Sequence, residues 1–113
     1  MNEPSSNPLA DIVRRFKGEA TDSAKSIDEM AHSLTRATDP RASVAAIREQ
    51  AHKLKGAAGV LDFPDVKNHA AAVEDIAASL TIDAAMSPEA IELASKALES
   101  AAEALLSAVD AGL

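Results

Sequence analysis

The chain has 113 residues, enough for one domain with a single hydrophobic core, and it carries a formal net charge of −7. This acidic balance argues against a nucleic-acid binder, which needs a basic surface to neutralise phosphates. The absence of cysteine excludes disulfides and thiol chemistry, and neither a signal peptide nor an apolar run of about 20 residues is visible, so we expect a cytoplasmic protein without membrane contact.

The composition favours helices over strands. Aromatic residues make up 2% of the chain, so the core must be built from aliphatic side chains and alanine, whereas strands favour β-branched and aromatic residues. Residues 1–7 are rich in proline, serine and asparagine and are predicted to form a disordered lead-in. Residues 8–113 are then predicted to form a single helical domain.

Two helices are predicted in the first third of the chain. A short helix begins near residue 8 and ends at Gly18, because glycine is unfavourable inside a helix. A second helix is capped by Thr21 or Asp22, and it ends at the break formed by residues 38–40, Thr-Asp-Pro.

The clearest apolar pattern belongs to the third predicted helix. Six of its apolar residues recur at spacings of 3-4-3-4-3, as in a helix that packs in a bundle: Val44, Ile47, Ala51, Leu54, Ala58 and Leu61. A fourth helix follows Pro64, and a last helix is capped by Ser87 before Pro88 and ends near Gly112. These elements predict an all-α fold, an up-down antiparallel four-helix bundle with a short additional N-terminal helix.

The third helix carries a histidine with two glycines beside it. Each interior glycine destabilises a helix by about 1 kcal/mol relative to alanine, so the presence of Gly56 and Gly59 inside this helix requires an explanation. At about 3.6 residues per turn, His52 points roughly 130° away from the apolar face, and both glycines lie further along on nearly the same side. They clear the helix surface around an outward-facing imidazole, which is a competent nucleophile near neutral pH.

The region around this histidine resembles the histidine-containing phosphotransfer (HPt) domain family. The resemblance is close over residues 44–76, and the helix layout matches over nearly the whole chain. The motif residues are His52, Leu54, Lys55, Gly56 and Leu61, and the downstream matches are Val66 and the Val73-Glu74 pair. One position departs from the family pattern, since Asp62 stands where the family commonly has glycine ten residues after the histidine.

This resemblance implies roles for individual residues. His52 would be the phosphorylated nucleophile, and Lys55 would neutralise the charge of the phosphate. Gly56 and Gly59 would let a receiver domain close over the imidazole. We expect further docking contacts from exposed residues that flank the histidine, which are Arg48, Glu49 and Lys53.

The function implied by the resemblance is phosphoryl relay between the aspartates of response-regulator receiver domains in a bacterial two-component phosphorelay. The chain has no nucleotide-binding motif, so we expect a phosphoryl carrier rather than an enzyme. No cofactor of its own is expected, because the receiver domain would supply the aspartate, Mg²⁺ and a lysine. We expect the protein to act as a monomer.

Two alternatives remain open from the sequence. The chain could be the phosphoacceptor domain of a chemotaxis-type or hybrid histidine kinase, phosphorylated by a separate ATP-binding domain. It could also be a non-catalytic helical adaptor in which His52 is incidental. Direct phosphorylation by a kinase domain would favour the first, and partner binding that is indifferent to His52→Gln would favour the second.

The other titratable residues are given structural roles. His69 falls near the apolar side of its helix and is predicted to be a partly buried structural residue, and His32 is predicted to be solvated. A metal site that joins His52 and His69 is improbable, because no spacing places two ligands on one helix face. The following carboxylates are expected to lie on a solvated face, and no polar residue of the fourth helix is assigned a role: Asp62, Asp65, Glu74 and Asp75.

Overall fold

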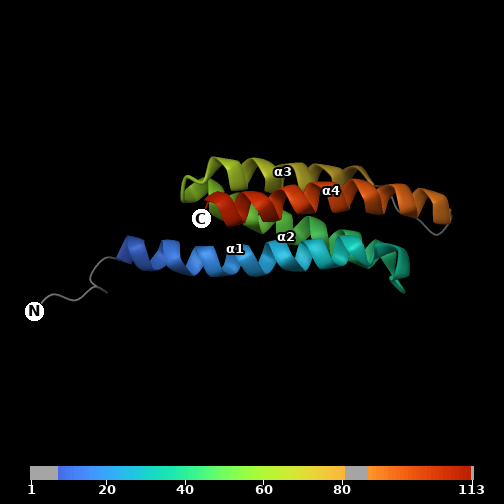
Figure 1. Ribbon diagram of the computed structural model, residues 1–113, viewed down its shortest axis with the longest axis horizontal. Helices are drawn as coiled ribbons and strands as arrows, with labels where there is room; N and C mark the ends of the chain where they lie inside the picture. Colours follow the sequence, from blue (N-terminus) through green and yellow to red (C-terminus); the bar gives the residue numbers. More distant parts are fainter. Residues whose placement is uncertain (1–7, 81–86, 113) are drawn as a thin grey trace, which may run out of the picture.

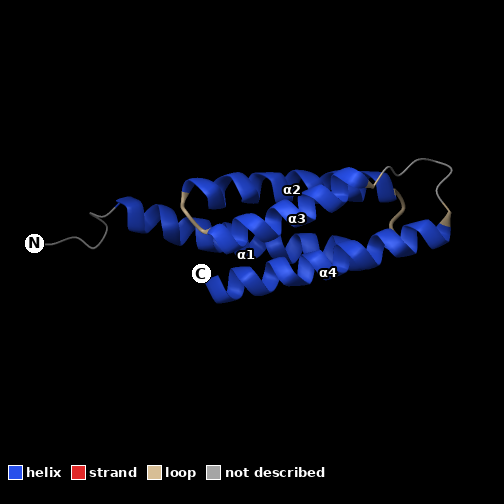
Figure 2. Ribbon diagram, turned by 90° about the horizontal axis from the view of Figure 1, so that it is seen from above, coloured by secondary structure: helices blue, strands red, loops and turns tan. Residues whose placement is uncertain are grey.

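The computed structural model describes residues 8–80 and 87–112, and within these residues the fold is entirely helical. Its elements are α1 (Pro8–His32), the 3₁₀ turn η2 (Leu34–Arg36), α2 (Pro40–Val60), α3 (Pro64–Ser79) and α4 (Pro88–Gly112). Successive α-helices reverse direction, and Figures 1 and 2 show all four lying along one common axis. Helix α1 packs on α2 and α4, and α3 packs on the same two helices. The predicted up-down four-helix bundle is confirmed.

The short additional N-terminal helix is not present, and this part of the prediction is wrong. Helix α1 continues through Gly18 without interruption. Its buried residues recur every three or four positions across the glycine, so one apolar stripe packs along the whole helix: Phe16, Ala20, Ala24, Ile27 and Ala31. Gly18 is exposed and has no neighbouring side chain. Packing of this stripe offsets the cost of about 1 kcal/mol that the glycine imposes.

The core of the bundle consists of aliphatic residues and alanine, as the composition predicts. On α2 the buried positions are those of the predicted apolar seam, namely Val44, Ile47, Ala51, Leu54 and Ala58. The many alanines let the helix axes approach closely, and the larger side chains fill the space between them. None of the described helices is long and apolar enough to cross a membrane.

Proline and a polar cap fix where two of the helices begin. The Asp39 side chain accepts a hydrogen bond from the Ala42 backbone N–H over 3.2 Å, one residue before Pro40 opens α2. In the same way the Ser87 hydroxyl accepts from the Ala90 N–H over 3.2 Å, which confirms the predicted cap of α4.

The turn between α2 and α3 is a Schellman motif centred on Asp62. The Phe63 N–H donates to the Ala58 carbonyl over 2.8 Å, and the Asp62 N–H donates to the Gly59 carbonyl over 3.4 Å. Asp62 has φ = 63°, the left-handed conformation that glycine adopts most readily. The departure from the family pattern at this position therefore leaves the turn geometry intact. The Phe63 ring stacks on Phe16 with centroids 5.3 Å apart, which anchors the turn against α1.

We expect Asp62→Gly to stabilise the domain by about 0.5–1 kcal/mol, because it relieves the strain of a left-handed non-glycine residue. A thermal melt followed by circular dichroism measures the effect. Asp65→Gly is the matched control, since Asp65 lies in the first turn of α3 and glycine there should destabilise the helix. Destabilisation by Asp62→Gly would show that the Asp62 side chain contributes more than the strain it causes.

Candidate functional site

His52 lies on the outer surface of α2, as its position on the helical wheel predicts. Its side chain is 66% exposed, while the seam residues on either side of it in the sequence, Ala51 and Leu54, are buried. The ring is therefore accessible to a macromolecular partner. Its attachment to the middle of a packed helix fixes the position of its Cα and Cβ atoms.

A carboxylate from the neighbouring helix holds the ring. His52 Nδ1 lies 2.7 Å from Glu74 Oε2, and the Glu74 side chain is only 14% exposed. An ionised carboxylate can only accept, so Nδ1 must carry the hydrogen of this bond. In the neutral ring, Nε2 then has a free lone pair. The contact thus selects one tautomer and leaves Nε2 as the nucleophilic atom.

Lys55 completes a three-residue arrangement by pairing with the other oxygen of the same carboxylate. Its Nζ lies 2.5 Å from Glu74 Oε1, so the carboxylate bridges the lysine and the histidine. The hydrogen bond from Lys55, helped by that from His52, lowers the pKa of Glu74 against the opposing effect of burial. A carboxylate with a lowered pKa keeps its stabilising charge above its ordinary pKa and loses it as the pH falls through the lowered value. Glu74 is therefore ionised at neutral pH.

Two of the predicted docking residues, Arg48 and Glu49, line a shallow hollow beside the ring. This hollow of about 370 Å³ is lined by Ala45, Arg48, Glu49, His52 and Glu74. Lys53 lines a separate hollow between α1 and α2, and it forms an exposed ion pair with Glu49 over 3.2 Å. The structure thus brings Arg48 and Glu49, together with the small residue Ala45, to the edge of the site, while Lys53 faces α1.

Comparison with known protein families shows to which family the chain belongs. A family model described as the Hpt domain matches residues 11–112. The chain belongs to the Hpt domain family. No curated protein and no solved structure matches it. An Hpt domain is a phosphotransfer module of two-component signalling, a carrier of phosphoryl groups that works with response regulators and kinases.

The two glycines of this Hpt domain have no packing role within the chain. A Cβ atom built at Gly56 meets no atom within 4 Å, and one built at Gly59 meets only the flexible Lys67 side chain at 3.6 Å. Both positions are exposed on α2. Close contact between helices therefore does not account for either glycine.

Glu74 is the member of this candidate site that the sequence analysis missed. The sequence places it on a solvated face, and this prediction is wrong because α3 turns the side chain toward α2. A signal for it exists in the chain. His52 lies eleven residues before Phe63 in the turn, and its partner Glu74 lies eleven residues after it. Gly59 and Lys67, which also lie next to each other, are four residues before and four residues after Phe63. Counting outward from the turn between two antiparallel helices pairs residues of the Hpt domain that face each other.

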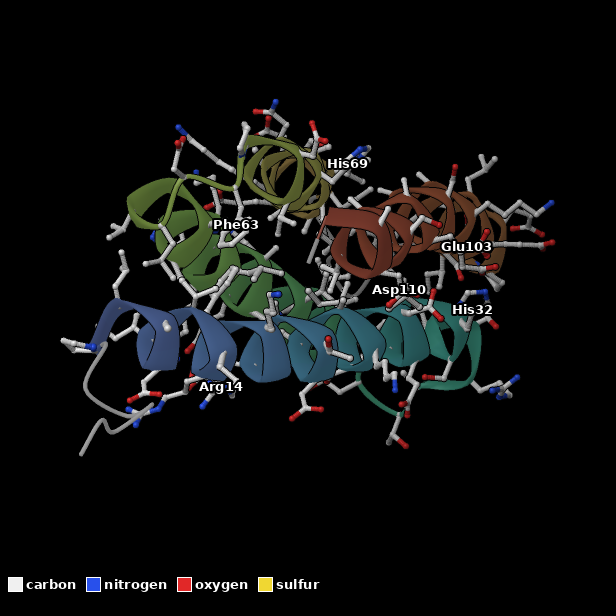
Figure 3. The ribbon with its side chains drawn as sticks, turned by 60° about the vertical axis from the view of Figure 1, so that its left-hand side comes forward. Arg14, His32, Phe63, His69, Glu103 and Asp110 are labelled. Carbon is white, nitrogen blue, oxygen red and sulfur yellow. The ribbon has the colours of Figure 1, made fainter. Side chains whose placement is uncertain are left out.

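The other two histidines differ from each other in their surroundings. His69 is half-buried on α3, as predicted, and Figure 3 shows it on the side of α3 near α4. Among the described residues, neither His52 nor His69 belongs to a group of three or more potential metal ligands. His32 is exposed as predicted, but three carboxylates surround it, an arrangement that the sequence pattern does not predict.

Proposed function

We propose that this Hpt domain relays phosphoryl groups between the aspartates of receiver domains, with His52 as the phosphorylated residue. The observation that carries the proposal is the exposed ring whose Nδ1 is held by the half-buried carboxylate of Glu74. An incidental surface histidine would not need a neighbouring helix to fix its tautomer. The arrangement favours one reactive atom, Nε2, which lies on the side of the ring away from Glu74.

The transfer step uses this lone pair. Nε2 attacks the phosphorus of an aspartyl phosphate, an N–P bond forms, and the P–O bond to the aspartate breaks. The aspartate leaves as a free carboxylate, and the electron pair of the broken bond stays on its oxygen. The imidazole keeps its hydrogen on Nδ1 and becomes positively charged, so the Glu74 carboxylate stabilises the product as well as the tautomer. Transfer to a second receiver reverses these bond changes.

The remaining charge stabilisation is assigned to the partner and to Lys55. Lys55 supplies a positive charge next to Glu74, and it keeps that carboxylate ionised. Mg²⁺ bound by the receiver domain would neutralise charge on the moving phosphoryl group. The domain itself would then act as a carrier, as a monomer in the cytoplasm, and Gly56, Gly59, Arg48, Glu49 and Lys53 would contact the receiver.

A reconstitution with purified partners tests the relay. A receiver charged with ³²P-phosphate is mixed with the protein, and a second uncharged receiver is added later. We expect label on the protein that is labile in acid and stable in alkali, followed by label on the second receiver. Label that arrives from an ATP-fed kinase domain but never from a receiver would instead favour the phosphoacceptor domain of a histidine kinase.

The glycine at position 56 offers a test of the docking surface. Gly56→Ala should stabilise the domain by about 1 kcal/mol in a thermal melt, because the added methyl meets no other atom and alanine favours the helix. Gly56→Leu should slow transfer from a receiver while the domain remains folded. Gly18→Leu is the matched control, since Gly18 is equally unobstructed but lies on α1. Equal transfer rates in the two leucine variants would remove Gly56 from the docking surface.

A further inference from the structure

A second cluster of titratable side chains lies between α1 and α4 and plays no part in the chemistry of His52. It consists of Asp28 and His32 on α1 with Glu99 and Glu103 on α4. Each pair is spaced four residues apart, so its two members share one helix face. Figure 3 shows His32 and Glu103 side by side where the last turns of α1 meet α4.

The backbone fixes the orientation of the His32 ring. Its Nδ1 lies 2.8 Å from the Asp28 carbonyl oxygen, which can only accept, so Nδ1 carries the hydrogen. The other nitrogen, Nε2, lies 3.1 Å from Glu103 Oε2 and 3.6 Å from Glu99 Oε1. A neutral ring would thus direct a lone pair at two carboxylates. The contact is favourable when Nε2 carries a second proton and donates a hydrogen bond to Glu103, or when a metal ion takes the place of that proton.

The three carboxylates of this cluster carry more negative charge than the positive side chains around them can neutralise. Among the described residues, no lysine or arginine forms an ion pair with Asp28, Glu99 or Glu103. One oxygen of Asp28, Oδ1, is closed off from solvent and accepts no hydrogen bond, and its nearest positive candidate is His32 Nδ1 at 3.4 Å. The hydrogen bond to the Asp28 carbonyl and the surrounding carboxylates raise the pKa of His32. These observations indicate a place for positive charge, which either a second proton on His32 or a metal ion bound at Nε2 supplies.

The separations suit a metal ion with short bonds. Zn²⁺ binds imidazole nitrogen and carboxylate oxygen at about 2.0–2.2 Å, so neighbouring ligand atoms of a tetrahedral site lie about 3.3–3.5 Å apart. The two distances from His32 Nε2, 3.1 and 3.6 Å, lie on either side of this range. Ligand atoms of Asp28, His32 and Glu103 all lie within 4.8 Å of one another, so these three residues form the group that could hold the ion, and Glu99 lies beside it.

A buried serine hydroxyl also orients the Glu99 carboxylate. The Ser95 hydroxyl, 2% exposed, lies 2.7 Å from Glu99 Oε2 and 3.0 Å from the Ala31 carbonyl oxygen. A carboxylate held in this way presents its other oxygen to His32, and hydrogen-bonded carboxylates with a backbone-oriented histidine are typical of metal sites. We propose that Asp28, His32 and Glu103, with Glu99 close to the imidazole, bind a divalent transition metal such as Zn²⁺ and thereby link α1 to α4.

Titration with ZnCl₂ tests this site, followed by calorimetry and by thermal melts at pH 7.5. We expect one equivalent to bind and to raise the melting temperature, while MgCl₂ does neither, because imidazole favours zinc over magnesium. His32→Gln should weaken zinc binding at least about tenfold. Glu103→Gln should weaken it as well, and its exposed side chain makes it the variant that keeps the fold if His32→Gln does not.

Two controls distinguish zinc binding at His32 from zinc binding at the other histidines. His52→Gln and His69→Gln should bind zinc like the parent protein, and the ¹⁵N shift of His32 Nε2 should move on zinc addition while those of the other histidines stay. No zinc binding, an equal response to Mg²⁺, or binding lost in His52→Gln but retained in His32→Gln would overturn the proposal. A His32 ring that titrates with protons only and does not respond to zinc would overturn it too.

Discussion

Replacing His52 with glutamine is expected to abolish phosphoryl uptake from a charged receiver domain. Glutamine keeps a polar side chain of similar reach on α2, but its amide nitrogen has no available lone pair with which to attack phosphorus. Because the His52 side chain is 66% exposed and lies outside the hydrophobic core, the variant should fold like the parent protein. Transfer of ³²P from the receiver to the protein measures the effect directly.

The other two histidines provide the controls for this experiment. His32→Gln and His69→Gln should each accept label at the parental rate, since both residues lie outside the arrangement of His52, Glu74 and Lys55. Circular dichroism should show the same helical content in all three variants. Acid-labile label on the His52→Gln protein would contradict the assignment and direct attention to another nucleophile.

The fold could be predicted from the sequence because its pattern of apolar residues is regular. The apolar seam of α2 repeats without a miss, and the predicted cap Ser87 marks the start of α4 with its own hydrogen bond. The prediction that a helix ends at Gly18 is wrong because the cost of glycine, about 1 kcal/mol, is local, whereas the stripe from Phe16 to Ala31 packs along the whole helix. Tertiary burial of several side chains outweighs a cost of that size.

The site was only partly predictable, for a related reason. The orientation of His52 follows from the angle between residues on one helix, so the sequence of α2 alone predicts it. The partner of His52 lies on another helix, and its identity depends on the register between α2 and α3. That register is fixed by the turn at Asp62, whose left-handed conformation a glycine would signal and an aspartate does not. The surroundings of His32 depend in the same way on how α4 packs against α1.

Glu74→Ala is expected to slow phosphoryl uptake by about tenfold or more. The substitution removes a hydrogen bond to a charged group, worth about 1.5–3 kcal/mol, from a ring that becomes positively charged when it is phosphorylated. Glu74→Gln should lie between the alanine variant and the parent, because its amide oxygen can accept from Nδ1 but carries no charge. Rapid-quench measurement of transfer from a receiver gives the rates. Asp75→Asn is the matched control, since it removes a charge from the exposed next position on α3.

The role of Lys55 can be tested, because the structure and the motif resemblance give this lysine different partners. In the structure it contacts Glu74, whereas the resemblance implies contact with the phosphoryl group. If the lysine acts through Glu74, to which its Nζ is bonded, then Lys55→Ala should slow transfer in the parent protein and have little further effect in Glu74→Ala. Independent contact with the phosphoryl group would instead make the two effects multiply. We expect the first result for two reasons. Lys55 is the largest cause of the lowered pKa of Glu74. To contact a phosphoryl group on His52, the lysine would also have to break its ion pair with a half-buried carboxylate, which costs free energy. Multiplying effects would mean that docking of the receiver breaks the Lys55–Glu74 pair before transfer.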